Sequence, residues 1–264
     1  MATIVFLHAH PDDEASQTAG SMARAAAEGH RVVTVFATGG EHGEVPDDLE
    51  PGETVVQRRR REAQDSADVL GVARIAWLGY VDSGMTGWEQ NALDGAFSSA
   101  DVDEAGSRLA AVLDEEDADL LVGYDWHGGY GHPDHVQVHR VAHRAAELAA
   151  RPPRLLESTM NRDVVRAVFR AARAAGALKD DWDPDGPQDD GNPLGTPEAE
   201  IHLKVDVSDY LEHRRAALRA HRSQRTDTEA LLGMPAEAFT AMFGTDHYID
   251  PGRPPGVRVG WIVE

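Results

Sequence analysis

The sequence of 264 residues predicts an α/β fold, in which a Rossmann-like, mostly parallel sheet is flanked by helices and followed by a small C-terminal α/β extension. Three observations lead to this prediction. Short apolar runs alternate with longer segments of helical character, several of these segments end at a glycine or before a proline, and clusters of ionisable residues follow two apolar runs. Strands that alternate with helices imply βαβ units with right-handed crossovers, and therefore parallel strands.

The first elements set the pattern. Ile4–Leu7 is a short apolar run that predicts a strand ending at a polar loop. Ala15–Glu28 is rich in alanine and is followed by Gly29, which is typical of a helix with a glycine stop. The β-branched run Arg31–Ala37 predicts a buried strand, and the polar Thr38–Gly52 predicts a loop.

The alternation continues to about residue 160. Gly79–Ala100 contains glycine, serine and aspartate without a clear period, so we expect a loop there. The remaining elements expected in this part are a helix at Val55–Leu70 closed by Gly71, a strand at Ile75–Leu78, a helix from the capping signature Asp101–Glu104 to about Glu116, a strand at Leu120–Val122, a helix at Asp134–Ala150 and a strand at Leu155–Ser158.

The C-terminal part has a weaker pattern. Lys179–Pro197 is dense in aspartate, glycine and proline and predicts a mobile surface insert. A strand near Ile201–Val205, a helix from Ser208 to about Arg222 and a last strand near Val257–Val263 are expected after it. We expect one domain over residues 1–264, with a core at about 1–160 and the extension at about 161–264.

Composition narrows the classes of function. A net charge of −21 repels nucleic acid and anionic membrane surfaces, so we expect neither as a partner. No apolar stretch approaches the roughly 20 residues that a membrane-spanning helix needs, and Met1–Leu7 lacks the basic region of a signal peptide. We therefore expect a cytoplasmic protein with a small-molecule ligand, and the composition is also compatible with a homo-oligomer.

Two clusters of ionisable side chains follow predicted strands. The first strand ends in His8-Ala9-His10-Pro11-Asp12-Asp13-Glu14. The fourth ends in Tyr124-Asp125-Trp126-His127-Gly128-Gly129-Tyr130-Gly131-His132-Pro133-Asp134-His135. In open α/β sheets, ligands bind at the carboxyl ends of the strands. The two clusters converge on one crevice if their strands are neighbours.

The types of residue in these clusters predict a metal site. The chain has no cysteine, so its ligands must be His, Asp or Glu. Two imidazoles and one carboxylate with open positions for water form a catalytic pattern for Zn²⁺ and also for Fe²⁺. His10 and Asp13 from the first cluster and His135 from the second supply this set. Each residue alone has a structural explanation, such as an N-cap role for Asp12 or Asp134, but two His-Pro-Asp clusters after apolar strands favour a joint site.

The helix that follows offers a different arrangement of ligands. His135, His139 and His143 fall at i, i+4 and i+8, so a zincin-like pair of ligands is conceivable. That motif requires a glutamate directly after its first histidine, and Val136 stands there instead. We therefore expect His139 and His143 to be partly buried or solvated helix residues.

At these positions the sequence resembles the PIG-L/LmbE-like deacetylase family. Its signature is His-Pro-Asp-Asp-Glu after the first strand and a later His-Pro-Asp-His, and both are intact here. Thr38–Glu44, Arg59 with Glu62, Asp82–Met85 and Ala220–Gln224 also look like family segments. The resemblance covers most of the chain and implies a zinc-dependent N-deacetylase.

Part of this resemblance is more specific. Asp82–Met85, Gly128–His135 and Ala100–Asp103 look like the actinobacterial enzymes of mycothiol metabolism that act on N-acetylglucosaminyl-inositol. The likeness therefore implies removal of an acetyl group from an N-acetylglucosamine-type sugar conjugate. The insert at Lys179–Pro197 and the tail are less similar.

The resemblance implies a role for each residue of the two motifs. His10, Asp13 and His135 would hold the metal, and Asp12 would be the general base toward the attacking water. The oxyanion would be stabilised by the metal and by a neighbouring side chain from the second motif.

That second motif would supply the remaining chemistry. Tyr130 or His132 would contact the oxyanion, and His132 would also protonate the leaving amine because histidine titrates near neutrality. Asp134 would hydrogen-bond His132 and raise its pKa.

Three further residues resemble the family's sugar-contacting positions. Arg59, Asp82 and Glu44 carry guanidinium or carboxylate groups, which suit hydroxyl recognition. Arg59 lies in the run Arg58–Arg61, and such runs are commonly solvated helix faces. We expect Glu14 to support the site from behind or to act as a carboxylate at a helix N-terminus.

Alternative functions stay open. A mycothiol-conjugate-type amidase, or a deacetylase of another N-acyl glucosaminyl metabolite, would use the same metal site. A non-catalytic sugar- or nucleotide-binding module is a second class, but no glycine-rich dinucleotide or Walker-type loop is present. Phosphoryl transfer through a histidine and the Asp12–Asp13 pair would also need a phosphate-cradling loop.

Overall fold

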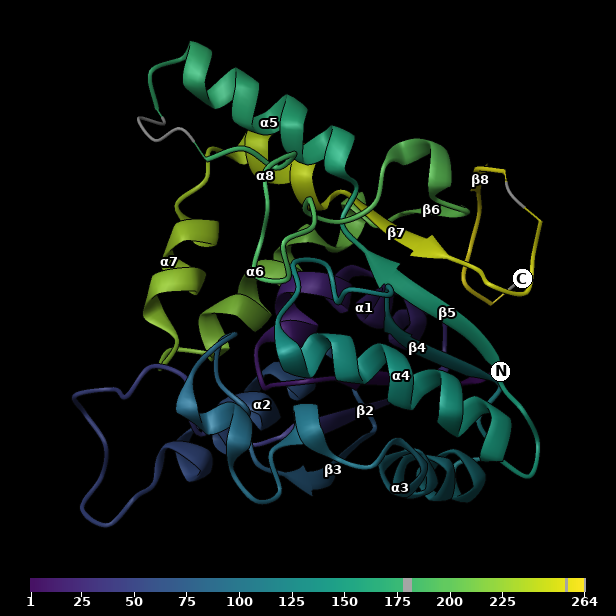
Figure 1. Ribbon diagram of the computed structural model, residues 1–264. Coiled ribbons are helices and arrows are strands. Elements are labelled where there is room, and N and C mark those ends of the chain that lie inside the picture. The colour runs from purple at the N-terminus through teal and green to yellow at the C-terminus, as the bar shows by residue number, and fades with distance from the viewer. Residues whose placement is uncertain (178–181, 255, 264) are drawn as a thin grey trace.

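The computed structural model describes residues 1–177, 182–254 and 256–263 and shows an eight-stranded sheet between layers of helices (Figure 1). The strands in chain order are β1 (Thr3–His8), β2 (Arg31–Thr38), β3 (Arg74–Tyr80), β4 (Leu120–Tyr124), β5 (Arg154–Thr159), β6 (Leu203–Asp206), β7 (Thr245–Ile249) and β8 (Arg258–Val259). The helices are α1 (Ala19–Ala27), α2 (Val55–Leu70), α3 (Val102–Glu115), α4 (Pro133–Leu148), α5 (Arg162–Ala174), α6 (Leu211–Ala220), α7 (Arg225–Leu232) and α8 (Ala236–Phe243).

The order of the strands creates a crevice at the centre of the sheet. The order is β3-β2-β1-β4-β5-β7-β6-β8, and the first five of these strands are parallel. From β1 the chain adds β2 and β3 on one side of the sheet and then β4 and β5 on the other side, so the direction of strand addition switches between β1 and β4. Ligands bind at such a switch point in open α/β sheets. The two ionisable clusters follow β1 and β4, which pair directly, so the condition under which the clusters converge on one crevice is met.

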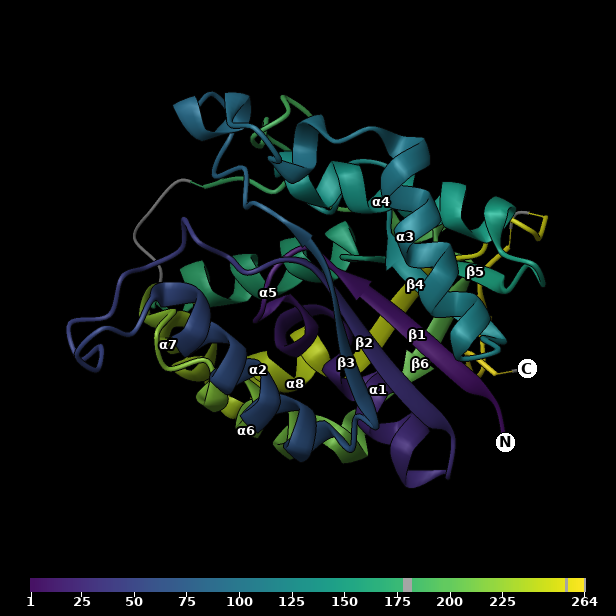
Figure 2. The same ribbon diagram turned by 90° about the horizontal axis from the view of Figure 1, so that it is seen from below.

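Helices cover both faces of the sheet (Figure 2), and each face has its own apolar core. On one face Val5 and Leu7 of β1 pack with α3 and α4, while on the other Ile4 and Phe6 pack with α1 and α6. Side chains alternate between the faces of a strand, so a strand that is apolar at every position must be covered on both sides. Therefore the continuous apolar run of β1 determines the three-layer architecture, and the predicted fold class is confirmed.

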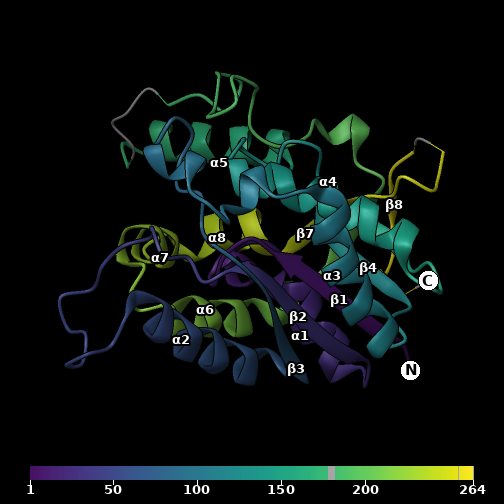
Figure 3. The ribbon, with the colours of Figure 1, turned by 60° about the horizontal axis from the view of Figure 1, so that its bottom comes forward.

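The C-terminal extension differs most from the expectation. Three helices, α5, α7 and α8, and the strand β7 are absent from the predicted elements, and Figures 1 and 3 place the helices together in one group. β7 inserts between β5 and β6 and is antiparallel to both. The extension therefore continues the main sheet, which is why the sheet is only mostly parallel.

Smaller differences occur at element boundaries. The helix expected from Ala15 starts with a π-helical turn at Glu14–Thr18 before α1, and such turns occur frequently at functional sites. The expected Gly79–Ala100 loop contains two short 3₁₀ turns, Glu89–Ala92 and Phe97–Ser99. The last strand is confined to the two residues of β8.

The insert expected at Lys179–Pro197 contributes to the site. Residues 179–181 of that insert lie outside the described residues. Further along, Asp189 N donates to Tyr130 O at 3.2 Å and Gly195 N donates to Gly129 O at 2.6 Å. The described part of the insert thus packs on the loop after β4. Across the ranges that the structure describes, no helix has the length and apolar composition that a membrane crossing requires.

Candidate metal and catalytic site

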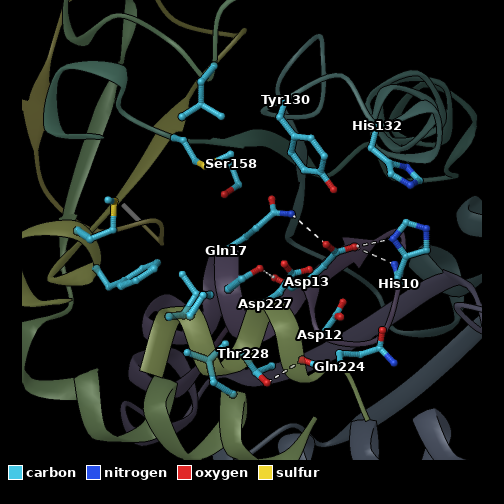
Figure 4. A pocket seen from close by; sticks show the side chains of 18 of the residues that line it. His10, Asp12, Asp13, Gln17, Tyr130, His132, Ser158, Gln224, Asp227 and Thr228 are labelled. Atoms are coloured by element: carbon cyan, nitrogen blue, oxygen red, sulfur yellow. Dashed lines mark hydrogen bonds and ion pairs between the residues drawn. The ribbon is translucent and has the colours of Figure 1, made fainter. Parts of the chain in front are cut away.

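The candidate site lies where β1 and β4 end, at the polar end of a cavity of about 650 Å³. Figure 4 shows His10, Asp12 and Asp13 from the loop after β1 facing Tyr130 and His132 from the loop after β4. The side chains of both predicted motifs therefore point into a single cavity.

A strained turn presents Asp12. Its φ angle is 114°, a conformation that residues other than glycine rarely adopt. The backbone N–H of Asp12 donates to Glu14 Oε2 at 2.9 Å, and the other oxygen of Glu14 accepts from Ser66 Oγ at 2.6 Å and from His221 Nε2 at 2.5 Å. This buried network holds the turn that directs Asp12, as expected for a supporting role of Glu14.

Arg59 holds the same turn from the other side. Only 3% of its surface is exposed, so the solvated helix face that the arginine run suggests is wrong for this residue. Its guanidinium donates to Pro11 O and to Gly40 O, and it pairs with Asp12 Oδ2 at 3.1 Å. Gly40 has a φ of 68°, and a Cβ there would lie 2.2 Å from Arg59 Nη1, so the glycine is needed for this approach.

The orientation of His135 follows from its backbone partner. His135 Nδ1 donates to Gly128 O at 3.1 Å, which leaves Nε2 as an acceptor on the side of Asp13. Nε2 is buried and makes no hydrogen bond among the described residues. A buried acceptor without a donor matches a ligand position for a cation.

His10 is oriented in the same manner by Asp134. His10 Nε2 donates to Asp134 Oδ2 at 3.1 Å, and the other oxygen of Asp134 accepts from Ser83 Oγ at 2.5 Å. The predicted hydrogen bond from the Asp134 carboxylate to His132 is wrong, because His10 and Ser83 occupy its oxygens. Such carboxylate–histidine pairs orient metal ligands in many proteins.

The three predicted ligands converge. His10 Nδ1 lies 3.4 Å from Asp13 Oδ2, and His135 Nε2 lies 3.2 Å from Asp13 Oδ1. Three other triads have ligand atoms that lie within 4.8 Å of one another: His10–His132–His135, His10–Asp82–Asp134 and, outside the cavity, His139–His143–Glu157. The Asp134 oxygens are already engaged, so we favour the set with Asp13, whose two oxygens each face one imidazole.

The electrostatics of the cluster favour a bound cation. Burial of His10 opposes its protonation. The charge of Asp82 and hydrogen bonds to Asp13 and Asp134 nevertheless hold the pKa of His10 well above its usual value. The carboxylates thus require a positive charge at this position, and a metal ion would supply it. The donor set of imidazole and carboxylate fits Zn²⁺ or Fe²⁺.

The two adjacent aspartates differ in pKa. Burial raises the pKa of Asp12 to about 6, and the charge of Arg59 opposes this effect. Burial would raise the pKa of Asp13, but the proximity of His135 and His10 holds it well below its usual value. One carboxylate is therefore poised near neutral pH while its neighbour stays ionised, which is a common division of roles between a base and a ligand.

His132 departs from the expectation. Burial, together with the charges of His10 and His135, lowers the pKa of His132 to about 2, so the predicted rise is wrong. His132 Nδ1 accepts from the backbone N–H of Asp134 at 3.1 Å, which places the proton on Nε2. The neutral ring is consequently a hydrogen-bond donor toward the cavity.

Tyr130 is a second hydrogen-bond donor from the loop after β4, beside His132. Its ring packs edge-on against His135 with centroids 5.0 Å apart, and its hydroxyl points into the cavity (Figure 4). Burial, reinforced by Asp13 and Asp12, raises the pKa of Tyr130 well above 10. The hydroxyl therefore keeps its proton and can donate it in a hydrogen bond.

The predicted sugar-contacting residues separate into two groups. Asp82 and Arg59 line the cavity, and Asp82 accepts from His42 N at 3.0 Å and Gly84 N at 2.8 Å. Glu44 is not among the cavity-lining residues, and its Oε1 accepts from Thr226 N at 2.7 Å in the first turn of α7. The carboxylate of Glu44 is stabilised at the N-terminus of α7, and its expected sugar contact stays a prediction.

Several supporting residues have no role predicted from the sequence. Ser83 and His221 lie within segments that resemble the family. Gln17 Nε2 lies 3.4 Å from Asp13 Oδ1, and the only sequence signal for this contact is that Gln17 follows Asp13 by four residues at the start of a helix. His139 and His143 lie partly buried outside the cavity beside Glu157, with His143 Nε2 2.7 Å from Glu157 Oε1.

Comparison with known proteins agrees with the motifs. The family described as PIG-L: GlcNAc-PI de-N-acetylase matches residues 5–146. A relative from Saccharomonospora viridis, 1D-myo-inositol 2-acetamido-2-deoxy-alpha-D-glucopyranoside deacetylase, is 39% identical over 234 residues, which cover 84% of this chain and 85% of the relative.

Solved structures agree at the level of the fold. N,N'-diacetylchitobiose deacetylase from Pyrococcus horikoshii has a TM-score of 0.56 at 22% identity, over 90% of this chain and 73% of that one. The 4-carboxy-2-hydroxymuconate hydratase from Pseudomonas putida KT2440 has a TM-score of 0.58 at 15% identity, and the match covers 98% of this chain and 100% of that one. The fold therefore supports more than one activity, and the residues of the site must decide the function. On its motifs and its relatives, the chain belongs to the PIG-L (GlcNAc-PI de-N-acetylase) family.

Proposed function

We propose that the protein is a zinc-dependent N-deacetylase that hydrolyses the acetamide of an N-acetylglucosaminyl conjugate. One observation carries the proposal: His10 Nδ1 and His135 Nε2 face different oxygens of Asp13, at 3.4 and 3.2 Å, beside the raised-pKa carboxylate of Asp12. A binding module has no need of a base next to a set of metal ligands.

The side chains divide the work of amide hydrolysis. When bound, a divalent cation polarises the amide carbonyl and lowers the pKa of a coordinated water toward about 7. Asp12, with a pKa of about 6, accepts the proton of the attacking water and is then able to return it to the leaving nitrogen. Such positioned proton transfers contribute about 10²–10⁴-fold to rate.

Two side chains from the loop after β4, His132 and Tyr130, stabilise the oxyanion in this proposal. The neutral Nε2–H of His132 and the hydroxyl of Tyr130 are donors that face the cavity, so they suit the carbonyl oxygen as it gains negative charge. The sequence predicts a charged His132 that protonates the leaving amine. Burial disfavours the imidazolium form, so we assign His132 the role of a neutral hydrogen-bond donor instead.

The substrate follows from the relatives and from the polar wall. Relatives of 34–39% identity are named as deacetylases of 1D-myo-inositol 2-acetamido-2-deoxy-alpha-D-glucopyranoside, and we assign this amino-sugar class to the present chain. Asp82 and Arg59 offer charged groups to the hydroxyls of the sugar.

The test combines metal analysis with acetate release. The purified protein is stripped with a chelator, reloaded with Zn²⁺ and assayed on N-acetylglucosaminyl-inositol. We expect activity to return with about one zinc ion per chain. Asp12→Asn should keep its zinc and lose about 10²–10⁴-fold in kcat, whereas His135→Ala should lose zinc.

His139→Ala is the matched control, because His139 lies one turn further along α4 and outside the cavity lining. It should retain both zinc and activity. Full zinc occupancy in His135→Ala, or near wild-type turnover in Asp12→Asn, would refute the assignment.

A further inference from the structure

A second group of metal-ligating side chains lies outside the cavity, between α4 and β5. His139 and His143 come from α4 and Glu157 comes from β5, and one ligand atom of each lies within 4.8 Å of the others. Figure 1 shows α4 running along β4 and β5 at this place. We call these three side chains the outer cluster, because none of them lines the cavity.

The helix and the strand each turn the right side chains toward the cluster. Residues i and i+4 share one face of a helix, and the rings of His139 and His143 lie side by side with their centroids 4.5 Å apart. Alternate residues share one face of a strand, so Glu157 points to the same side as Leu155, which packs against the core beneath α4. The carboxylate therefore meets the histidine face of the helix.

Both rings converge on a single oxygen, Glu157 Oε1. His143 Nε2 lies 2.7 Å from this oxygen and His139 Nδ1 lies 3.7 Å from it. His139 Nδ1 also lies 3.1 Å from Tyr124 O, so the backbone of β4 holds this ring beside the carboxylate. Rigid elements thus place three ligand side chains together before any ion arrives, which favours metal binding.

The charges of the cluster favour a cation. The side chain of Glu157 is only 8% exposed, and its ion pairs within the described part of the chain are with the two imidazoles and not with lysine or arginine. Neutral imidazoles do not compensate the charge of a buried carboxylate, and such a charge is costly to bury alone. The net charge of −21 adds a negative potential that attracts cations to the surface.

The chemistry of the cluster suits a borderline divalent ion. Imidazole and carboxylate are ligands of Zn²⁺. A neutral imidazole carries one proton, and when this proton moves to Nδ1 of His143, Nε2 presents a lone pair. The ion then replaces the proton between His143 Nε2 and Glu157 Oε1, and the ring stays neutral. The side chains of His139 and His143 are 22% and 38% exposed, which provides an entry path and room for water ligands.

We propose that His139, His143 and Glu157 form a second site for Zn²⁺, separate from the candidate catalytic site. An ion at this outer site joins α4 to β5. His135 lies one turn before His139, so the same ion stabilises the helix that carries a predicted catalytic ligand. This inference goes beyond the proposed function and does not depend on hydrolysis in the cavity.

The outer site should bind zinc more weakly than the cavity site. It is partly open to water, and both rings must give up hydrogen bonds to Tyr124 O and Glu157 Oε1. Gel filtration of the reloaded protein should therefore leave about one zinc ion per chain, in the cavity site. His139→Ala accordingly remains a valid control for the cavity metal.

A zinc titration of the protein already loaded at the cavity site tests the inference. Bound Zn²⁺ is measured by equilibrium dialysis, and the melting temperature is followed over the same range of free zinc. We expect a second zinc ion per chain. The melting temperature should increase by roughly 5 °C when free zinc exceeds the dissociation constant about 100-fold, because the ion binds only the folded arrangement.

Two substitutions each remove one ligand. His143→Gln removes the imidazole at a partly exposed position, and Glu157→Gln removes the charge with little change in size. Loss of an outer partner of a ligand already weakens metal binding about 10–100-fold, so loss of a ligand should weaken binding of the second ion at least about 100-fold. The first ion should stay bound in both variants. If Glu157→Gln does not fold, His143→Gln alone decides.

Two controls repeat these changes elsewhere. His213→Gln and Glu237→Gln alter exposed residues of α6 and α8 and should keep the second ion. They separate a specific site from a general attraction of zinc to an acidic surface.

A second ion that the wild type binds and the folded ligand variants lose supports the inference. Binding of only one ion throughout the titration overturns it, and so does a second ion that either ligand variant holds as tightly as the wild type. Failure of the zinc-loaded enzyme to hydrolyse amino-sugar amides bears only on the proposed function, because the outer site is measured by metal binding.

Discussion

Arg59 Nη2 lies 3.1 Å from Asp12 Oδ2, and this buried pair joins the turn after β1 to α2. The same guanidinium donates to Pro11 O and Gly40 O. Arg59 therefore acts on Asp12 in two ways: its charge lowers the pKa of the carboxylate, and its hydrogen bonds fix the strained turn.

Replacement of Arg59 by glutamine should disturb both effects. Without the cation the pKa of Asp12 rises further above about 6, and a base works only when it is deprotonated. The acidic limb of the pH profile of kcat/KM should thus move to higher pH, with kcat reduced at least about tenfold at pH 7 and zinc content unchanged. Arg61→Gln, in the same arginine run but exposed, should leave the profile in place.

The pair of Ser83 and Asp134 should tune metal affinity. Asp134 accepts from His10 Nε2 at 3.1 Å and from Ser83 Oγ at 2.5 Å, so it fixes the ring that presents Nδ1 to the metal. Loss of such an outer partner typically weakens metal binding about 10–100-fold. We expect this range for Asp134→Asn and a smaller effect for Ser83→Ala, measured by competition with a chelator.

Ser99→Ala provides the comparison, because Ser99 Oγ donates only to the nearby Ala96 O among the described residues. Its zinc affinity should equal that of the wild type. Equal affinities in Asp134→Asn and the wild type would rule out the support of His10 by Asp134.

A side chain at Gly128 should displace His135. The φ angle at Gly128 is 64°, and a Cβ there would lie 2.1 Å from His135 Cβ. Gly128→Ala should therefore lower the melting temperature and the zinc content together, since the strain of about 1–3 kcal/mol and the clash both act on a metal ligand.

Gly52→Ala isolates the effect of the backbone alone. Gly52 has a φ of 84°, and a Cβ there would meet no atom of the described residues within 4 Å, so strain without a clash is expected. Its melting temperature should fall slightly while zinc content stays constant. A normal zinc content in Gly128→Ala would contradict the proposed contact.

His247 should make the fold sensitive to mild acid. Burial lowers the pKa of His247 to about 4 from the usual 6.5, and Asn161 Nδ2 lies 3.4 Å from its Nε2. Between pH 6.5 and 4 the unfolded chain therefore binds more protons than the folded one, so stability decreases as the pH falls through this window. At a pH below 4, this shift in the pKa of His247 lowers the free energy of unfolding by about 3 kcal/mol.

His247→Gln should reduce this acid dependence, to which the buried His8, with a pKa also lowered to about 4 by burial, contributes in the same direction. The measurement is the free energy of unfolding in urea at several pH values. His213→Gln, at an exposed position on α6, should retain it. The same slope with pH in His247→Gln and the wild type would exclude His247 as its source.

Local patterns in the sequence were sufficient for the parallel part of the fold and for the choice of candidate metal ligands. The apolar run of β1 and the β-branched run of β2 predict buried strands because period and composition act over a few neighbouring residues. Each ionisable cluster directly follows such a strand, so His10, Asp13 and His135 could be selected before any contact was known.

The C-terminal extension was less predictable. α5 begins after Asn161, whose side chain accepts from Asp163 N and Val164 N, and its alternating apolar and charged residues form one apolar face. This helix has a local signal in the sequence, although no helix was predicted there. β7 has only five residues, and its place between β5 and β6 comes from pairing with strands far away along the chain.

Residue types and their order along the chain therefore determined which side chains reach the crevice, because the end of a strand is a local property. Only the tertiary structure decided how those side chains pair: Asp134 supports His10 and not His132, Glu44 turns to α7, and Arg59 is buried against Asp12. These pairings join segments distant in sequence, and they depend on distances and burial that appear only when the sheet and its helices are assembled.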